Sequence, residues 1–551
     1  MSDNKKQSFV QGAFILVAAA LLVKFIGAFF KIPLANLIEN DGMGLFNSAY
    51  QIYTIMFIIA TAGFPTAISK MVAESLALDR KMEADRVFKV AVCILAVIGV
   101  AGSLFLFFGA DYIAGWIENT RSFDAIRAIA PAVLCVSFMA VFRGYFQGRQ
   151  NMYPTAISEV TEALGKLIFG YLFAWMFMRH SVEKASAGAV FGVTMGTVLG
   201  FFTLLAMYMF YRKKREPYAP GEVTDSYKNI TKKLIRIAVP ITIGASVSSL
   251  TNLADMFTVM RRLQDITQLT PEFMEKYSSV IGTLKNFDGV SMNEQLANSL
   301  YGMYTGKALT LFNFPLTMVV ALGMSVVPVI AGALAKKDSL GAQRAVNTVL
   351  KLTILFAIPC AIGMYVLASP ILHVVFHDTL STTLLQKLAI SIVFVSLLQI
   401  TTSILQAYGR TVVPVVNMVI GGIIKVVINY HLVAVPEINI DGAPIGTMVC
   451  YFTVMVLNMF WIIKETKCKF GIVEYIVKPV FAGGIMGVVV HFLYNGLAGY
   501  GTVAALGVSV IAAVFVYFAM LLVIKAFKED DVRMLPKGET ILKIFRKFHL
   551  I

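Results

Sequence analysis

The feature that most constrains this chain is a series of long apolar segments separated by short polar loops. Of its 551 residues, 58% are hydrophobic and only 14% are charged, whereas soluble domains have about 45–50% apolar and 25% charged residues. About 20 apolar residues suffice to cross the roughly 30 Å hydrocarbon core of a bilayer. The sequence therefore predicts an all-α polytopic membrane protein with about fourteen transmembrane helices, at 8–37, 47–76, 87–110, 124–148, 154–178, 184–211, 233–260, 299–334, 342–368, 383–408, 412–434, 443–464, 474–495 and 502–526.

The charges of the loops alternate along the chain. Loops on the cytoplasmic side of a membrane carry an excess of Lys and Arg, so we expect both termini to be cytoplasmic. The net charge of +15 is then a property of membrane topology, and it does not indicate a nucleic-acid partner. The basic loops contain Lys5 and Lys6, Arg80 and Lys81, Arg149, the run 212–215, Lys336 and Lys337, Arg410, Lys464 and Lys525.

Two stretches about 260 residues apart follow the same plan. Residues 142–166 read FRGYFQGRQNMYPTAISEVTEALGK, and residues 403–425 read SILQAYGRTVVPVVNMVIGGIIK. Each ends an apolar helix with Gln, Gly and Arg, begins the next with Pro, and places a Lys about three turns later. Chance likeness of apolar helices is the alternative. Self-similarity of this kind is typical of an internal repeat, and it predicts two pseudo-symmetric lobes related by an axis along the membrane normal.

The repeat divides the chain into lobes of six helices, with the last two helices left without a counterpart. The tail alternates apolar and basic residues, which favours an amphipathic helix on the inner leaflet. The predicted parts are an N-lobe at 1–211, a cytoplasmic linker at 212–232, a C-lobe at 233–465, two C-terminal helices within 466–526, and a cytoplasmic amphipathic tail at 527–551.

Several lysines fall at middle or outer depth within the predicted spans. A charge inside a span costs about 2.5–3.5 kcal/mol on insertion scales, so it needs water or a partner. For a single lysine the alternative is snorkelling to an interface. If the lysines converge, they line a cationic cavity between the lobes that binds an anionic substrate, since a Lys ammonium binds phosphate as a point charge. The candidate substrate-binding residues are Lys24, Lys31, Lys166, Lys307 and Lys425.

Other charged residues in the spans are candidates for coupling or gating. Arg143 lies in the first repeat. Glu162 and Lys166 are spaced for an i,i+4 pair on one helix, and Asp255 is close enough in sequence to two arginines for an interfacial ion pair. The coupling and gating candidates are Glu159, Glu162, Asp255, Arg261 and Arg262.

Signatures of enzymes and metal sites are absent from the sequence. Gly165-Lys166 and Gly306-Lys307 lack the Ser or Thr that a P-loop requires, and there is no HExxH motif. His373 and His377 have a metal-ligand spacing but no third ligand, and the five cysteines are scattered among apolar helices. We therefore expect a transporter and not an enzyme, with no catalytic residues, no bound metal and no cofactor.

The repeated stretch at 142–166 resembles a region characteristic of MurJ-like and SpoVB/YtgP-like polysaccharide transport proteins of the MOP (multidrug/oligosaccharidyl-lipid/polysaccharide) exporter superfamily. Residues 23–53, VKFIGAFFKIPLANLIENDGMGLFNSAYQIY, and 315–338, PLTMVVALGMSVVPVIAGALAKKD, resemble the same proteins. The resemblance implies fourteen helices, two six-helix lobes forming a V, and two extra helices that make a groove for a lipid tail.

The resemblance also implies a function in a bacterial plasma membrane. Members of the family that this chain resembles move undecaprenyl-diphosphate-linked oligosaccharides outward, so membrane lipids and cell-wall synthases are the implied partners. We expect a flippase for lipid II in peptidoglycan synthesis, driven by the membrane potential or a monovalent ion. The alternatives are a flippase for a teichoic acid or capsule precursor, a cation-coupled multidrug exporter, and a membrane scaffold that transports nothing.

The first predicted helix carries a motif of this family in altered form. MurJ-like proteins have a basic residue there, a Gly three positions on and a second basic residue further along, which correspond to Lys24, Gly27 and Lys31. The family usually has Arg, the second spacing is one residue longer here, and Ile32-Pro33 replace the acidic residue that often follows. These departures leave the identity of the glycan open.

Overall fold

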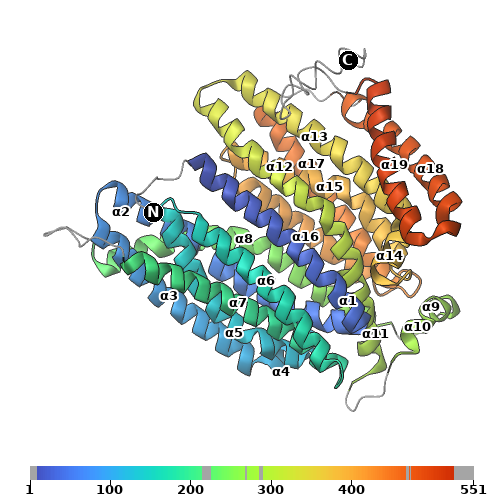
Figure 1. The fold of residues 1–551 in the computed structure, drawn as a ribbon, viewed down its shortest axis with the longest axis horizontal. Helices are drawn as coiled ribbons and strands as arrows, with labels where there is room; N and C mark the ends of the chain where they lie inside the picture. Colours follow the sequence, from blue (N-terminus) through green and yellow to red (C-terminus); the bar gives the residue numbers. More distant parts are fainter. Residues whose placement is uncertain are drawn as a thin grey trace. The chain divides into compact units, whose positions relative to one another are not determined.

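The structure is a computed structural model that describes residues 9–213, 225–266, 270–284, 290–466, 471 and 473–526. Every regular element in these ranges is helical (Figure 1). The predicted tail 527–551 and most of the predicted linker 212–232 lie outside the described residues. The α-helices are α1 (Phe9–Thr61), α2 (Phe64–Ala77), α3 (Lys81–Phe108), α4 (Ala110–Trp116), α5 (Phe123–Gly148), α6 (Tyr153–Phe177), α7 (Val182–Lys213), α8 (Tyr227–Gln264), α9 (Pro271–Lys276), α10 (Ser278–Ile281), α11 (Met292–Gly302), α12 (Leu309–Ala335), α13 (Ser339–Val366), α14 (Ala368–Phe376), α15 (Thr382–Ala407), α16 (Val412–Leu432), α17 (Gly442–Thr466), α18 (Lys478–Leu497) and α19 (Thr502–Val523).

Five shorter turns complete the described helical elements. They are the 3₁₀ turns η1 (Thr120–Ser122), η3 (Asn439–Asp441) and η5 (Ala498–Tyr500) and the π-helical turns η2 (Met303–Ala308) and η4 (Val473–Val477).

Thirteen helical segments in the described ranges are long and apolar enough to cross a membrane. The first of them, Ile15–Ala77, has 63 residues, and one crossing requires only about 20. It is kinked at Glu39, whose backbone leaves the helical region with φ 55° and ψ −164°. The predicted spans 8–37 and 47–76 lie on either side of this kink. The predicted all-α polytopic membrane fold is therefore confirmed, and the segment has enough length for two of the fourteen expected crossings.

The internal repeat is visible in the order and length of the helices. α3 and α13 both have 28 residues, and α5 and α15 both have 26. In each half a short helix, α4 or α14, stands between these two, and α6 and α16 follow. α18 and α19 come after the second series and have no equivalent in the first, as the sequence predicted.

The described chain forms two compact units. Unit 1 consists of 1–306 with 429–439, and unit 2 of 307–428 with 440–551. Unit 1 extends beyond the predicted N-lobe because α8 packs against α1, α2 and α3, and α11 packs against α1. The predicted lobe boundaries reflect the order of the repeat in the sequence, whereas the units reflect packing, so those boundaries stay predictions.

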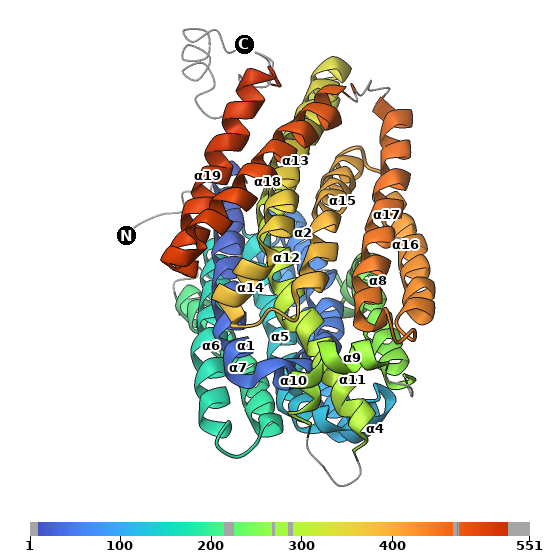
Figure 2. The same ribbon diagram turned by 90° about the vertical axis from the view of Figure 1, so that its right-hand side faces the viewer.

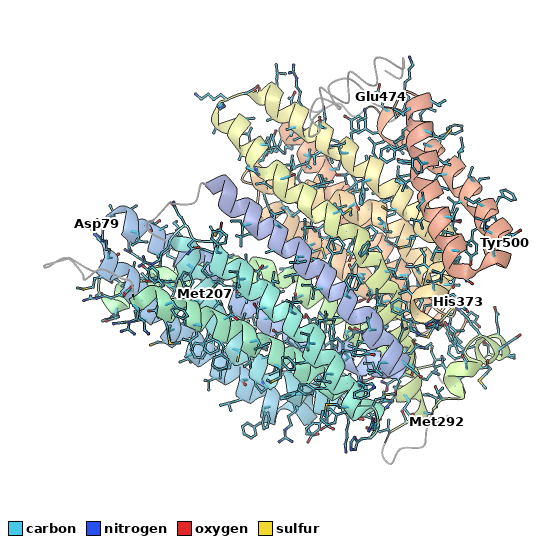
Figure 3. All side chains as sticks on the ribbon, in the orientation of Figure 1. Asp79, Met207, Met292, His373, Glu474 and Tyr500 are labelled. Atoms are coloured by element: carbon cyan, nitrogen blue, oxygen red, sulfur yellow. The ribbon has the colours of Figure 1, made fainter. Side chains whose placement is uncertain are left out.

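The core of unit 1 is rich in aromatic residues. Phe88 of α3 lies 4.8 Å between ring centroids from both Tyr145 of α5 and Tyr208 of α7, and Phe142 lies 5.3 Å from Tyr208. Offset and edge-on aromatic contacts of this kind stabilise a core beyond their buried area. Asp79, after α2, and Met292, at the start of α11, mark opposite ends of this unit (Figure 3).

Unit 2 is built on aliphatic packing among α12, α13, α15 and α17. Val319, Val346, Ile400 and Ile462 are each fully buried in one cluster. α18 and α19 lie side by side and extend the unit through contacts with α13 (Figure 2). Glu474 and Tyr500 mark the two ends of α18 (Figure 3).

Candidate functional site

Three charged side chains form an ion cluster inside the spans of unit 1. Arg143 of α5 donates from Nη2 to Oε2 of Glu162 on α6 at 2.9 Å, and Lys166 donates from Nζ to Oε1 of the same carboxylate at 2.6 Å. Arg143 also donates from Nε to Oγ of Ser158 at 3.2 Å. We call Arg143, Glu162 and Lys166 the α5–α6 ion cluster. One carboxylate between two cations leaves it with a formal charge of +1.

Burial explains why the members of this cluster depend on one another. Arg143 is 8% exposed and Glu162 is 6% exposed. Removing one partner of a buried ion pair typically costs about 3–5 kcal/mol, because the remaining charge is left uncompensated. Glu159, one turn before Glu162 on the same helix, is only partly buried. The i,i+4 pair expected from the sequence is thus present, and Arg143 extends it to a second helix.

The position of α6 depends on glycines of α7. Gly188, Gly192, Gly196 and Gly200 recur every four residues and face α6. A Cβ atom at Gly196 would lie 2.5 Å from the backbone nitrogen of Lys166 and 2.7 Å from the carbonyl oxygen of Glu162. Small residues at this spacing let transmembrane helices approach closely. The spacing was available in the sequence and could have indicated this packing.

The first helix presents two of the predicted lysines on one face. Lys24, Gly27 and Lys31 are three and four residues apart, which places them on the same side of α1. Lys24 is exposed and Lys31 is half-buried. A Cβ atom added at Gly27 would contact no heavy atom within 4 Å. This open face carries two positive charges. No described contact joins it to the α5–α6 ion cluster.

Lys307 and Lys425 belong to unit 2. Lys307 lies in the π-helical turn η2 and donates to Oδ2 of Asp378 at 2.8 Å, with side-chain exposures of 7% and 10%. Asp378 also accepts hydrogen bonds from the backbone nitrogen of Leu380 and from Ser381. π-Helical turns are frequent at functional positions. Lys425 is buried on α16. The predicted shared cavity would join two units, so it stays a prediction.

Asp255, Arg261 and Arg262 lie on α8 in unit 1. Asp255 is buried and accepts a hydrogen bond from Asn429 Nδ2. Arg261 approaches Glu118, and Arg262 pairs with Asp265. The two arginines therefore have described acidic partners other than Asp255, and the coupling and gating roles stay predictions.

A second polar network joins four elements of unit 1. Both terminal nitrogens of Arg121 bind the carboxylate of Asp41, and its Nε donates to Glu183 at 2.9 Å. Asn298 of α11 donates to Asp41 Oδ1 at 2.7 Å and accepts from Asn119 at 2.8 Å. None of these five residues is among the candidates predicted from the sequence. We call these five residues the Arg121 network.

Backbone shape allows this network to form. α1 turns at Glu39, and the glycines that follow let α11 approach closely. A Cβ atom at Gly44 would lie 2.3 Å from the carbonyl oxygen of Asn298, and one at Gly302 would lie 1.8 Å from that of Asn40. Larger side chains at these two positions would separate α1 from α11.

Most of this chain is similar to known protein families and to curated membrane proteins. Residues 9–334 match the model of a family described as "Polysaccharide biosynthesis protein", and residues 305–431 match the MatE family model. The chain is 25% identical to the uncharacterized membrane protein YabM of Bacillus subtilis, with 98% of each chain covered. It is 23% identical to the lipid II flippase MurJ of the same organism, with 88% of each covered.

A solved structure has the same fold. The lipid II flippase MurJ in an inward closed conformation matches with a TM-score of 0.66 and 13% identity, covering 94% of this chain and 98% of that one. The polysaccharide biosynthesis model covers more than half of the 551 residues. This multi-pass membrane protein therefore belongs to the polysaccharide biosynthesis protein family, and it has the fold of the MOP superfamily transporters.

Proposed function

We propose that this chain is a flippase that moves a lipid-linked cell-wall precursor, lipid II, from the inner to the outer leaflet of a bacterial plasma membrane by alternating access. The similarity to a lipid II flippase over most of the chain supports the proposal. Both termini would be cytoplasmic. The membrane potential or a monovalent ion would drive transport, and cell-wall synthases would use the product.

The observation that carries the proposal is the excess of positive charge within the spans of unit 1. Among the charged residues that the sequence singled out within these spans, the basic ones, Lys24, Lys31, Arg143 and Lys166, outnumber the acidic ones, Glu159, Glu162 and Asp255. Moving a diphosphate through a low-dielectric slab without countercharge would be prohibitive, since even one buried ion costs several kcal/mol. An exporter of cationic drugs would need the opposite balance.

The α5–α6 ion cluster suggests how the cations act. The carboxylate of Glu162 pairs with both Arg143 and Lys166. This pairing keeps the two positive charges close together when no substrate is bound. A diphosphate carries more negative charge than one carboxylate, so it competes for the same donors. Arg143 would supply planar, paired donors and Lys166 a point charge. The lysines Lys24 and Lys31 would attract the diphosphate to the same lobe.

Purified protein in liposomes tests the proposal. Lipid II with a fluorophore on its head would be placed in both leaflets, and an impermeant reductant would bleach the outer leaflet only. With the protein, we expect nearly all of the fluorescence to be bleached, because lipid II exchanges between leaflets. A bleached fraction equal to that of protein-free liposomes contradicts the proposal. In cells, depletion of the protein should strand lipid II on the inner leaflet.

The same liposomes distinguish the alternatives. A lipid-linked teichoic acid precursor with the same fluorophore would replace lipid II in a parallel experiment. The match to the MatE family model over residues 305–431 favours cation-coupled drug export as the second candidate. Uptake of ethidium in exchange for sodium ions or protons, without movement of lipid II, would support that candidate instead.

A further inference from the structure

A pocket of about 450 Å³ lies in unit 1 between α4 and the last turns of α8. Its aromatic walls are Trp116, Phe257 and Tyr430, and its polar groups include Glu118 and two arginines of α8. Pockets that bind small molecules measure about 300–1,000 Å³. The predicted topology puts this pocket on the outward side of the membrane, since its two segments border predicted outward loops.

One half of the pocket is fixed by hydrogen bonds. The guanidinium of Arg262 lies 4.3 Å over the ring of Tyr430, and Nε donates to the carbonyl oxygen of Tyr430 at 2.9 Å. The carbonyl oxygen of Glu118 accepts from Nε2 of Gln264 at 2.6 Å. Walls that are ordered before a ligand arrives lower the entropic cost of binding.

The other half is available to a ligand. Trp116 is 62% exposed, with its ring 4.2 Å from that of Phe257. The side chain of Arg261 is 72% exposed and reaches Glu118 only at 3.6 Å, whereas charge-assisted hydrogen bonds measure about 2.7–2.9 Å. Arg261 can therefore turn toward an anion at little cost. The hydroxyl of Thr258 donates to the carbonyl oxygen of Ala254 at 2.7 Å. The lone pairs of this hydroxyl can therefore still accept a hydrogen bond.

We propose that this pocket binds a sugar phosphate, the head of the lipid-linked substrate on the outward side. The indole face of Trp116 offers an apolar surface to the C–H face of a pyranose ring. Glu118 and Thr258 accept from sugar hydroxyls, and Arg261 pairs with the phosphate. Aromatic residues are common at membrane interfaces, but an interface residue alone does not require arginines and a carboxylate around it. The choice of a sugar as ligand rests on the proposed function.

The fluorescence of Trp116 tests this inference directly. The chain has three tryptophans, Trp116, Trp175 and Trp461, so replacing the last two with Phe leaves the pocket residue as the sole indole. The purified full-length protein would be titrated with N-acetylglucosamine 1-phosphate. Two matched probes would follow: N-acetylglucosamine, which lacks the phosphate, and glycerol 1-phosphate, which lacks the sugar and mimics a phospholipid headgroup.

We expect a saturable change with the sugar phosphate and affinities at least about tenfold lower for either partial probe. Arg261→Gln should weaken binding of the sugar phosphate about tenfold, the effect of one lost charge-assisted hydrogen bond. Arg127→Gln is the matched control, because Arg127 is an exposed arginine of unit 1 that stacks on Phe107 outside this pocket. Circular dichroism would check that each variant is folded.

Three results overturn the inference: no saturable change, equal affinity for either partial probe, or unchanged binding in Arg261→Gln. The experiment measures binding and no transport, so its failure can be distinguished from a failure of the proposed function. If lipid II moves between leaflets and the sugar phosphate does not bind, the pocket assignment is wrong. If the sugar phosphate binds and lipid II does not move, the flippase assignment is wrong.

Discussion

Arg121 binds both carboxylate oxygens of Asp41, at 2.8 and 2.6 Å, although the two residues are 80 positions apart. This two-point geometry is among the strong forms of ion pair, and it fixes orientation as well as distance. Arg121 follows α4, whereas Asp41 follows the kink of α1. The pair therefore holds the turn between the first two predicted spans against the loop before α5.

Replacing Arg121 should destabilise the protein. Arg121→Met leaves Asp41 and Glu183 facing each other without their cation, and we expect a loss of about 2–3 kcal/mol, below the value for fully buried pairs because both carboxylates keep some contact with solvent. The measurement is thermal unfolding of the purified protein in detergent. Arg127→Met, which removes an exposed arginine, should cost less than about 1 kcal/mol. Equal midpoints for the two variants would contradict the role of the network.

Glu162→Gln should be more damaging than the loss of both charges. The single variant leaves Arg143 and Lys166 close together in a buried place without the carboxylate that both contact. We expect it to be destabilised by about 3 kcal/mol or more. Glu162→Gln with Lys166→Met removes one cation as well and should recover much of that stability. The double variant should still fail to move lipid II in liposomes. Recovery of transport along with stability would show that Lys166 has only a structural role.

Gly196→Ala tests the packing behind the α5–α6 ion cluster. The added methyl would meet backbone atoms of Lys166 and Glu162 that cannot turn aside, so we expect a loss of about 1–3 kcal/mol. Gly27→Ala is the matched control, since its methyl would meet nothing within 4 Å. Unfolding midpoints of the two variants give the comparison. If Gly27→Ala is equally destabilised, the effect is general to glycines in these helices.

Lys24→Ala should reduce transport at least about tenfold, because a lost charge-assisted contact is worth about 1.5–3 kcal/mol. Lys24→Arg should keep much of the activity, since the position needs a positive charge. A complementation assay with checked membrane levels would compare them with Lys166→Ala and Lys307→Ala. Lys70→Ala, at an exposed lysine of α2, is the control. Normal growth of all three alanine variants would rule out the cationic cavity.

Much of the fold followed from the sequence because each span carries its own signal. Apolar length predicted the helices, and the repeated Gln-Gly-Arg and Pro pattern predicted the equivalence of α5 and α15. The pair of Glu162 and Lys166 was also predictable, since i,i+4 neighbours on one helix meet whatever surrounds them. The glycines at four-residue intervals on α7 carried a usable signal that the prediction did not use.

The Arg121 network could not be predicted in the same way. Its partners are separated by up to 257 positions, and each one lies near a predicted loop, where a charged residue is ordinarily expected to face water. The kink at Glu39 and the close approach of α11 bring these residues together and partly shield them from solvent. The convergence of Lys24, Lys166 and Lys307 likewise depends on contacts between distant segments. It stays a prediction that the complementation assay of the three alanine variants tests.

The π-helical turn at 303–308 gives Lys307 its direction. A π turn contains one more residue than an α turn, and each residue advances the helix by about 100°. A residue that follows the surplus one therefore points about 100° away from its direction in a continuous α-helix. α11 presents Asn298 to Asp41, while Lys307 meets Asp378. A single surplus residue thus sets the direction in which the side chain of Lys307 points. Deleting one residue from the turn would rotate the helix face that follows it without removing any charge.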